Sequence, residues 1–184
     1  MRIIAGTRKG HTIYAPKGLD TRPTGDRVRE AAFNLIGPVD GARVLDLFAG
    51  SGAMGLEALS RGAERAVFVE SDADATRAIE RNLDKLRLTG ATVLRRDALQ
   101  ALAAEAAAGR DYDLLLVDPP YAMFADLQPR LARYLPSILA PDGLLVVDQE
   151  LVEGDPVRRC HRRDPVDAAG DVVNVRLHDV SHFR

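Results

Sequence analysis

The sequence predicts an α/β fold in which a mostly parallel sheet is covered by helices on both faces. Short, continuous apolar runs alternate with helix-forming stretches from about residue 40 to residue 150. Strands of this kind are typical of a parallel sheet that is buried on both sides. With 184 residues, 46% of them hydrophobic, the chain is long enough to bury a core of its own.

The element pattern is regular. Strands are expected at 43–47, 65–70, 92–95, 113–117 and 144–147, and helices at about 25–37, 52–61, 72–88, 99–108 and 126–139. Two weaker runs near 157–162 and 172–177 predict an antiparallel hairpin at the C-terminal edge of the sheet.

The N-terminus differs from the rest of the chain. Two β-prone runs, at 2–5 and 12–15, flank a polar turn with Gly6, Lys9 and Gly10, which predicts a β-hairpin. We therefore expect an extension at 1–24 and a main domain at 25–184. Residues 1–30 hold seven basic and three acidic side chains, a net charge of +4 on a chain whose total is −2. A nucleic-acid partner would meet this local surface, not the overall charge.

Composition excludes several classes. The single Cys160 rules out an internal disulfide framework, and four scattered His residues offer no zinc-ligand spacing, so no metal is expected. No stretch approaches the roughly 20 apolar residues of a membrane span. We expect a cytoplasmic, monomeric protein without a membrane partner.

A glycine-rich turn follows the first strand. Gly50, Gly52 and Gly55 match G-x-G-x-x-G between a strand and a helix, where glycines allow a close approach to a ligand. Glu70 ends the next strand 20 residues after Gly50, and a carboxylate there can accept both hydrogen bonds of a ribose diol. A nicotinamide oxidoreductase shares these features.

Asp46, inside the first strand, favours a different cofactor. A carboxylate here would repel a pyrophosphate but suits the ammonium group of S-adenosylmethionine. Asp97, after the third strand, could receive the adenine edge or cap the following helix. The predicted cofactor-binding residues are Asp46, Phe48, Ala49, Gly50, Ser51, Gly52, Glu70, Ser71, Asp97 and Ala98.

The fourth expected strand ends in Asp118-Pro119-Pro120-Tyr121. Asp118 and the Pro119 carbonyl can accept the two N–H bonds of an exocyclic amine and direct its lone pair at a methyl group. Pro120 stiffens the turn, and Tyr121 offers a ring on which a base can stack. These four residues are the predicted catalytic corner, and they indicate methyl transfer to a planar amine.

The order Asp46, Gly50, Glu70, Asp97 and Asp118 resembles that of class I S-adenosylmethionine-dependent methyltransferases, which have a Rossmann-like sheet. Over nearly the whole chain the sequence is similar to the bacterial 16S ribosomal RNA guanine-N2 methyltransferase family. The motifs are Arg2-Ile-Ile-Ala-Gly6, Arg22-Pro-Thr24 with Asp26-Arg-Val-Arg-Glu30, Leu45 to Gly52, and Asp118 to Tyr121. The resemblance implies S-adenosylmethionine as donor, a guanine of 16S rRNA as acceptor, and a 30S subunit or assembly intermediate as substrate. It also implies that the N-terminal segment engages RNA.

Several alternatives stay open at this stage. An adenine-N6 methyltransferase of DNA or RNA uses the same corner, and a glutamine methyltransferase shares it but generally begins with Asn. The candidate RNA contacts are Lys9, Arg22, Thr24, Arg27 and Arg29. Each of these could equally belong to a solvated surface.

Overall fold

The computed structural model describes residues 1–16, 25–147 and 172–173, and it confirms the α/β class. The strands are β1 (Arg43–Leu47), β2 (Arg65–Glu70), β3 (Ala91–Arg95), β4 (Tyr112–Val117), β5 (Leu139–Val147) and β6 (Val172–Val173). They form one sheet in the order β3-β2-β1-β4-β5-β6, and each neighbouring pair is parallel.

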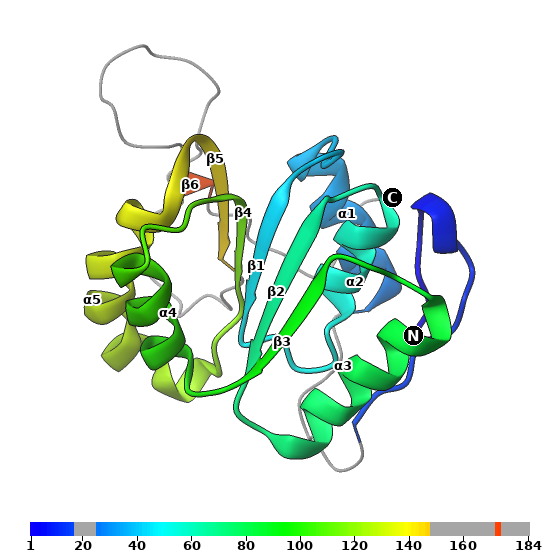
Figure 1. The fold of residues 1–184 in the computed structure, drawn as a ribbon, viewed down its shortest axis with the longest axis horizontal. Coiled ribbons are helices and arrows are strands. Elements are labelled where there is room, and N and C mark those ends of the chain that lie inside the picture. Colours follow the sequence, from blue (N-terminus) through cyan, green and yellow to red (C-terminus); the bar gives the residue numbers. More distant parts are fainter. Residues whose placement is uncertain (17–24, 148–171, 174–184) are drawn as a thin grey trace, which may run out of the picture.

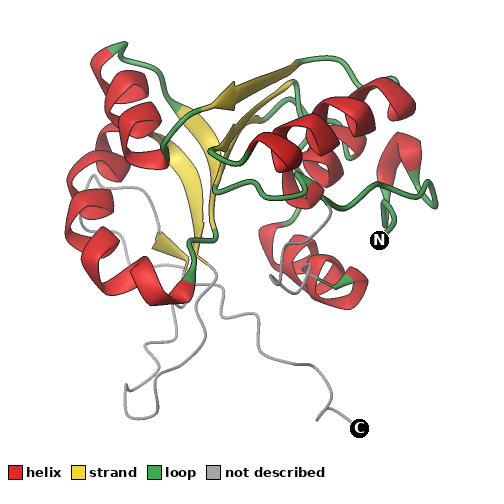
Figure 2. Ribbon diagram, turned by 90° about the horizontal axis from the view of Figure 1, so that it is seen from below, coloured by secondary structure: helices red, strands yellow, loops and turns green. Residues whose placement is uncertain are grey.

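Helices cover both faces of this sheet. They are α1 (Asp26–Ile36), α2 (Ala53–Ser60), α3 (Ala73–Leu86), α4 (Ala98–Ala107) and α5 (Tyr121–Ile138). In Figures 1 and 2, α4 and α5 lie on one side and α1, α2 and α3 on the other. Side chains alternate along β1, so that Val44 packs in the core beneath α2 and α3 and Leu45 in the core beneath α4 and α5.

The strand order places a site at the centre of the sheet. From β1 the chain continues to β2 on one side, and later returns to β4 on the other side. The carboxyl ends of β1 and β4 therefore meet where the direction of winding reverses. In open α/β sheets, ligands bind in the crevice at this point.

Two element starts differ most from the sequence prediction. Helix α5 begins at Tyr121, directly after Pro120, instead of near residue 126. Strand β5 begins at Leu139 instead of residue 144. The Pro141-Asp142-Gly143 sequence is typical of a turn and predicted a later start, but it lies within the strand. The pairing absorbs this stretch as an irregularity, since the register shifts between Tyr112 and Leu114 of β4.

The predicted antiparallel C-terminal edge is wrong for the part of the tail that the structure describes. Val172–Val173 pairs with Leu145 and Val146 of β5 in parallel. An antiparallel pair needs only a tight turn, whereas a parallel return needs a dozen residues or more. The segment 148–171 is long enough for that return. The other predicted tail strand lies outside the described residues.

The N-terminal segment has the antiparallel pairing of the predicted hairpin, but with a single bridge, between Arg2 and Thr12, in place of two strands. Ile3 N–H donates to the His11 carbonyl over 2.9 Å, and a 3₁₀ turn, η1 (Gly6–Arg8), connects the two arms. The ladder is short because other backbone groups of the segment bond to helix side chains.

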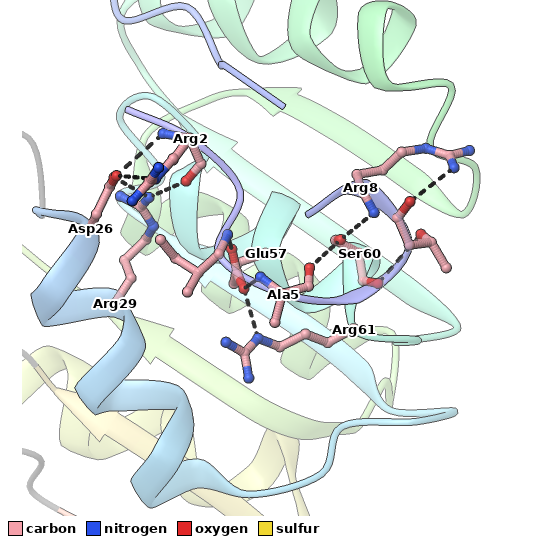
Figure 3. Close-up of polar contacts among 10 residues, drawn as sticks. Arg2, Ala5, Arg8, Asp26, Arg29, Glu57, Ser60 and Arg61 are labelled. Atoms are coloured by element: carbon pink, nitrogen blue, oxygen red, sulfur yellow. Dashed lines mark hydrogen bonds and ion pairs between the residues drawn. The ribbon is translucent and has the colours of Figure 1, made fainter. Parts of the chain in front are cut away.

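The buried carboxylate of Glu57, on α2, accepts two backbone N–H groups of the N-terminal segment (Figure 3). It receives the N–H groups of Ile4 over 2.8 Å and Ala5 over 2.9 Å, and Arg61 Nε over 2.7 Å. Next to it, Ser60 Oγ donates to the Ala5 carbonyl over 2.6 Å and accepts from Arg8 N–H over 3.0 Å. The segment is thus fixed to the domain by buried polar bonds.

Replacing Glu57 by Ala is expected to cost about 2–3 kcal/mol of unfolding free energy, because two backbone donors and Arg61 lose their acceptor. Urea denaturation of both proteins measures the difference. Glu64→Ala, at an exposed position, is the matched control and should change little. An equal loss of unfolding free energy in the two variants would contradict this role of Glu57.

Candidate active site

One backbone bond ties the turn after β1 to the neighbouring strand, and a second lies within the turn itself. Ala49 N–H donates to the Val69 carbonyl of β2 over 3.0 Å, and Gly52 N–H to the Ala49 carbonyl over 2.7 Å. Gly52 has φ of 73°, and a Cβ on it would lie 2.9 Å from Ile79 Cγ1. Phe48 has φ of 67°, in the left-handed region that non-glycine residues avoid, which marks local strain at the strand end.

Gly55, the last glycine of the motif, is required for packing. A Cβ on it would lie 2.4 Å from Phe68 Cε1 and 3.0 Å from Asp46 Oδ2. Its N–H donates to Asp46 Oδ2 over 2.9 Å. The glycine therefore brings α2 against β1 and β2 and gives the buried carboxylate its hydrogen bond.

Gly55→Ala is expected to destabilise the fold by about 1–3 kcal/mol, because the added methyl group overpacks a rigid contact with Phe68. The cofactor affinity should fall as well, since Asp46 must move. Denaturant midpoints and calorimetric titration check the two effects. Gly25→Ala is the control, because a Cβ there meets nothing within 4 Å. A fully stable Gly55→Ala protein would contradict the packing argument.

Asp46 is the buried acid of the site, with 4% of its surface exposed. Burial, together with the charges of Asp118 and Glu70, raises the pKa of its carboxyl to about 7, against the lowering effect of the hydrogen bond from Gly55. An ionised carboxylate here gains from a cationic partner. The carboxylate of Asp46 therefore fits the ammonium group that the sequence predicts at this position.

Glu70 has a role that the sequence did not reveal. Its Oε2 accepts Gly50 N–H over 2.8 Å, and its Oε1 accepts Asp72 N–H over 2.8 Å. The side chain ties the glycine turn to the start of α3. The 20-residue spacing from Gly50 indicated a site residue, but not this structural bond. Its predicted contact with a ribose stays a prediction.

Asp97 caps α4, as one of the two sequence interpretations proposed. Its Oδ1 accepts Gln100 N–H over 3.0 Å. The residue also lines a cavity of about 110 Å³ at the carboxyl edge of the sheet. The cap does not exclude a ligand contact, because a carboxylate has further lone pairs.

This cavity brings together residues that are far apart in the sequence. Six of the predicted site residues line it, namely Phe48, Glu70, Ser71, Asp97, Ala98 and Pro120. Whole-ligand pockets usually measure about 300–1,000 Å³, so this hollow is smaller than a site for a whole cofactor. Val69, Arg96 and Met123 line it too and were not predicted. Met123 was missed because its helix was expected to start later.

The predicted catalytic corner lies beside the glycine turn. Leu47 of β1 pairs with Val117 of β4, and Asp118 N–H donates to the Leu47 carbonyl over 3.4 Å. Asp118 is exposed, Pro119 is buried, and Pro120 occupies the position before the first residue of α5. Tyr121 is the first residue of that helix. The predicted roles of Asp118 in catalysis and of Tyr121 in stacking stay predictions.

The predicted RNA contacts separate into three groups. Lys9 and Arg27 are exposed, as a contact requires. Arg29 is buried, and its Nη2 donates to the Arg2 carbonyl over 2.6 Å and to Asp26 over 2.9 Å (Figure 3). A buried guanidinium cannot reach a phosphate, so Arg29 holds the N-terminal segment against α1 instead. Arg22 and Thr24 lie outside the described residues.

Within the described ranges, no group of three or more His, Cys, Asp or Glu side chains could hold a metal ion. No helix in the same ranges is both long and apolar enough to cross a membrane.

Known proteins resemble this chain in sequence and in structure. "Putative rRNA methyltransferase YlbH" of Bacillus subtilis is 50% identical over 154 residues, covering 82% of this chain and 83% of its own. "Ribosomal RNA small subunit methyltransferase D" of Escherichia coli is 38% identical over 159 residues, covering 85% and 78%. The solved "Putative methyltransferase yhhF" of Escherichia coli superposes with a TM-score of 0.70 at 35% identity, covering 79% and 78%.

The parallel sheet, the glycine turn at its reversal point and the neighbouring Asp-Pro-Pro corner define a methyltransferase of the S-adenosylmethionine-dependent, Rossmann-like class. Residues 1–162 match the family model described as "Conserved hypothetical protein 95". The chain belongs to this family.

Proposed function

We propose that this protein transfers a methyl group from S-adenosylmethionine to the exocyclic N2 of a guanine in 16S rRNA, on a small-subunit particle. The observation that supports the proposal best is that Phe48, Glu70, Asp97 and Pro120 line one cavity together, at the edge of the sheet where Asp118 follows β4. The relatives named as rRNA methyltransferases support the RNA substrate. The sequence resemblance supports guanine N2.

The bound cofactor supplies an electrophilic methyl carbon. The protein's part is to hold the amine in line with it, which is worth several kcal/mol through positioning alone. Asp118 and the Pro119 carbonyl accept the two N–H bonds of the amine. The bound cofactor would supply the methyl carbon to the nitrogen lone pair and keep the electron pair of the carbon–sulfur bond, and the cationic amine would lose one proton to Asp118 or to water. Asp46 would hold the ammonium group of the donor.

A target base must leave its stack to reach this corner, which costs a few kcal/mol. The exposed Met123 at the rim of the cavity provides an apolar surface for such a base. Unpaired or flipped guanines should therefore be preferred over those within a perfect duplex.

Incubation with labelled donor and, separately, small-subunit particles, free 16S RNA and DNA tests the proposal. Nucleoside analysis of each product should show N2-methylguanosine from small-subunit RNA. N6-methyladenosine would favour the alternative adenine methyltransferase instead. Absence of label in every RNA sample would overturn the proposal.

A further inference from the structure

The N-terminal segment and α3 together form a surface that lies outside the predicted catalytic corner. Five basic side chains gather on it, with one tyrosine in their midst. We call it the basic strip, and it consists of Arg8, Lys9, Tyr14, Arg81, Lys85 and Arg87. Glu80 and Asp84 are the exposed acids of this part of α3, so the strip keeps a net charge of +3 on a negatively charged chain.

Hydrogen bonds fix the two elements of the strip to each other. Asn82 receives Tyr14 N–H over 2.7 Å and donates to the Tyr14 carbonyl over 2.9 Å. Lys85 Nζ donates to the Thr12 carbonyl over 2.6 Å. The strip is therefore a rigid surface, and binding to it would cost little conformational entropy.

Tyr14 is held in a particular setting. The residue is 38% exposed, although it is large and apolar and its backbone is fixed by the bonds to Asn82. The Arg81 guanidinium lies 3.8 Å from the ring centre and Lys85 Nζ lies 4.6 Å from it. Arg81 and Lys85 are one helical turn apart, so they contact the ring from the α3 side. An exposed aromatic ring backed by cations suits a nucleobase next to phosphates.

The strip is oriented toward the cofactor cavity. Arg8 contacts the Leu86 and Arg87 carbonyls, Thr12 contacts Lys85, and Tyr14 contacts Asn82. From Arg8 to Tyr14, the N-terminal segment therefore runs along α3 toward the start of that helix. The start of α3 is tied to the glycine turn, because Glu70 bonds to both Gly50 and Asp72. Arg81 is nine residues from Asp72, a distance of about 14 Å along the helix.

We infer that the basic strip binds a single-stranded stretch of the substrate RNA that flanks the target guanine, with a base stacked on Tyr14 and phosphates on Lys9, Arg81 and Arg87. The inference rests on the proposed function, and it assigns a contact surface that extends beyond the catalytic corner.

Filter binding of full-length protein to 16S RNA over a salt series tests the strip without using catalysis. Tyr14→Ala should weaken binding about 5- to 100-fold, whereas Tyr14→Phe should bind like the unchanged protein. The double change Arg81→Glu/Arg87→Glu leaves the bonds from Asn82 and Lys85 in place. It should weaken binding at least about tenfold and lower the salt slope by about 1.5.

Arg133→Glu is the matched control, because Arg133 also lies over a tyrosine ring, that of Tyr134, but on α5. It should bind RNA normally. In the methyl-transfer assay the strip variants should raise KM for RNA, with kcat and the affinity for S-adenosylmethionine unchanged. Undiminished RNA affinity in both strip variants would overturn the inference, while methylation would still support the proposed function. If the protein bound RNA through Tyr14 but methylated no RNA, the proposed function would be refuted and the inference about the basic strip would stand.

Discussion

Asp118→Ala should lower the methyl-transfer rate by about a thousandfold, with the affinity for S-adenosylmethionine unchanged within a few-fold. The carboxylate is exposed at the end of β4, beside the glycine turn but not part of it. Losing it removes the acceptor that orients the amine and takes its proton, an effect typically worth 10²–10⁴-fold. Single-turnover measurement of the rate and calorimetric titration of the cofactor separate these two quantities.

Asp126→Ala is the matched control, since Asp126 is an exposed acid on the neighbouring helix α5. Its rate should be that of the unchanged protein. If Asp118→Ala instead lost cofactor binding and kept its single-turnover rate, the residue would belong to the donor site. The proposed arrangement of donor and acceptor would then be wrong.

Asp46→Asn should lower the affinity for S-adenosylmethionine about 10- to 100-fold, because a charged hydrogen-bond partner of the ammonium group is lost. In the unchanged protein the affinity should fall as the pH drops through about 7, where the buried carboxyl of Asp46 takes up a proton according to its raised pKa. The variant should lack this dependence. Titrations at pH 6, 7 and 8 measure both effects.

The same substitution should stabilise the fold. The pKa of Asp46 is raised from 3.8 to about 7 in the folded state, so the folded protein binds this proton more tightly than the unfolded chain. Its contribution to stability therefore falls as the pH rises from about 4 to about 7, and stays lowest above 7. At pH 8 Asp46→Asn should gain up to about 4 kcal/mol, and less at pH 5.

Denaturant unfolding at pH 5 and pH 8 measures the gain. A variant that binds the cofactor poorly but unfolds at higher denaturant would show that Asp46 is retained for function at the expense of stability. No gain at pH 8 would mean that the ionised carboxylate is not strained by its burial.

The strand–helix alternation, the glycine turn and the Asp-Pro-Pro corner were all readable from local patterns. Apolar runs of strand length and helical periodicity predict elements because burial selects side chains at each position. Glycine and proline predict turns because they restrict or free the backbone. These local rules placed Asp46 near the end of the first strand and Gly50 and Asp118 just after strands, and hence at one edge of the sheet.

Local patterns failed where a distant partner determines the outcome. The irregular start of β5 depends on pairing with β4, and the parallel direction of β6 depends on pairing with β5. The burial of Arg29 depends on the Arg2 carbonyl, 27 residues away. Its position in a basic segment could not reveal this.

The sequence by itself determined the α/β class, the cofactor motif and the amine-directed corner, since each follows from neighbouring residues. Tertiary structure alone decided that Glu57 fixes the N-terminal segment, that Glu70 closes the glycine turn, and that Tyr14 lies among the cations of α3. Those contacts join elements from opposite parts of the chain, and no spacing along the sequence encodes which buried donor meets which acceptor.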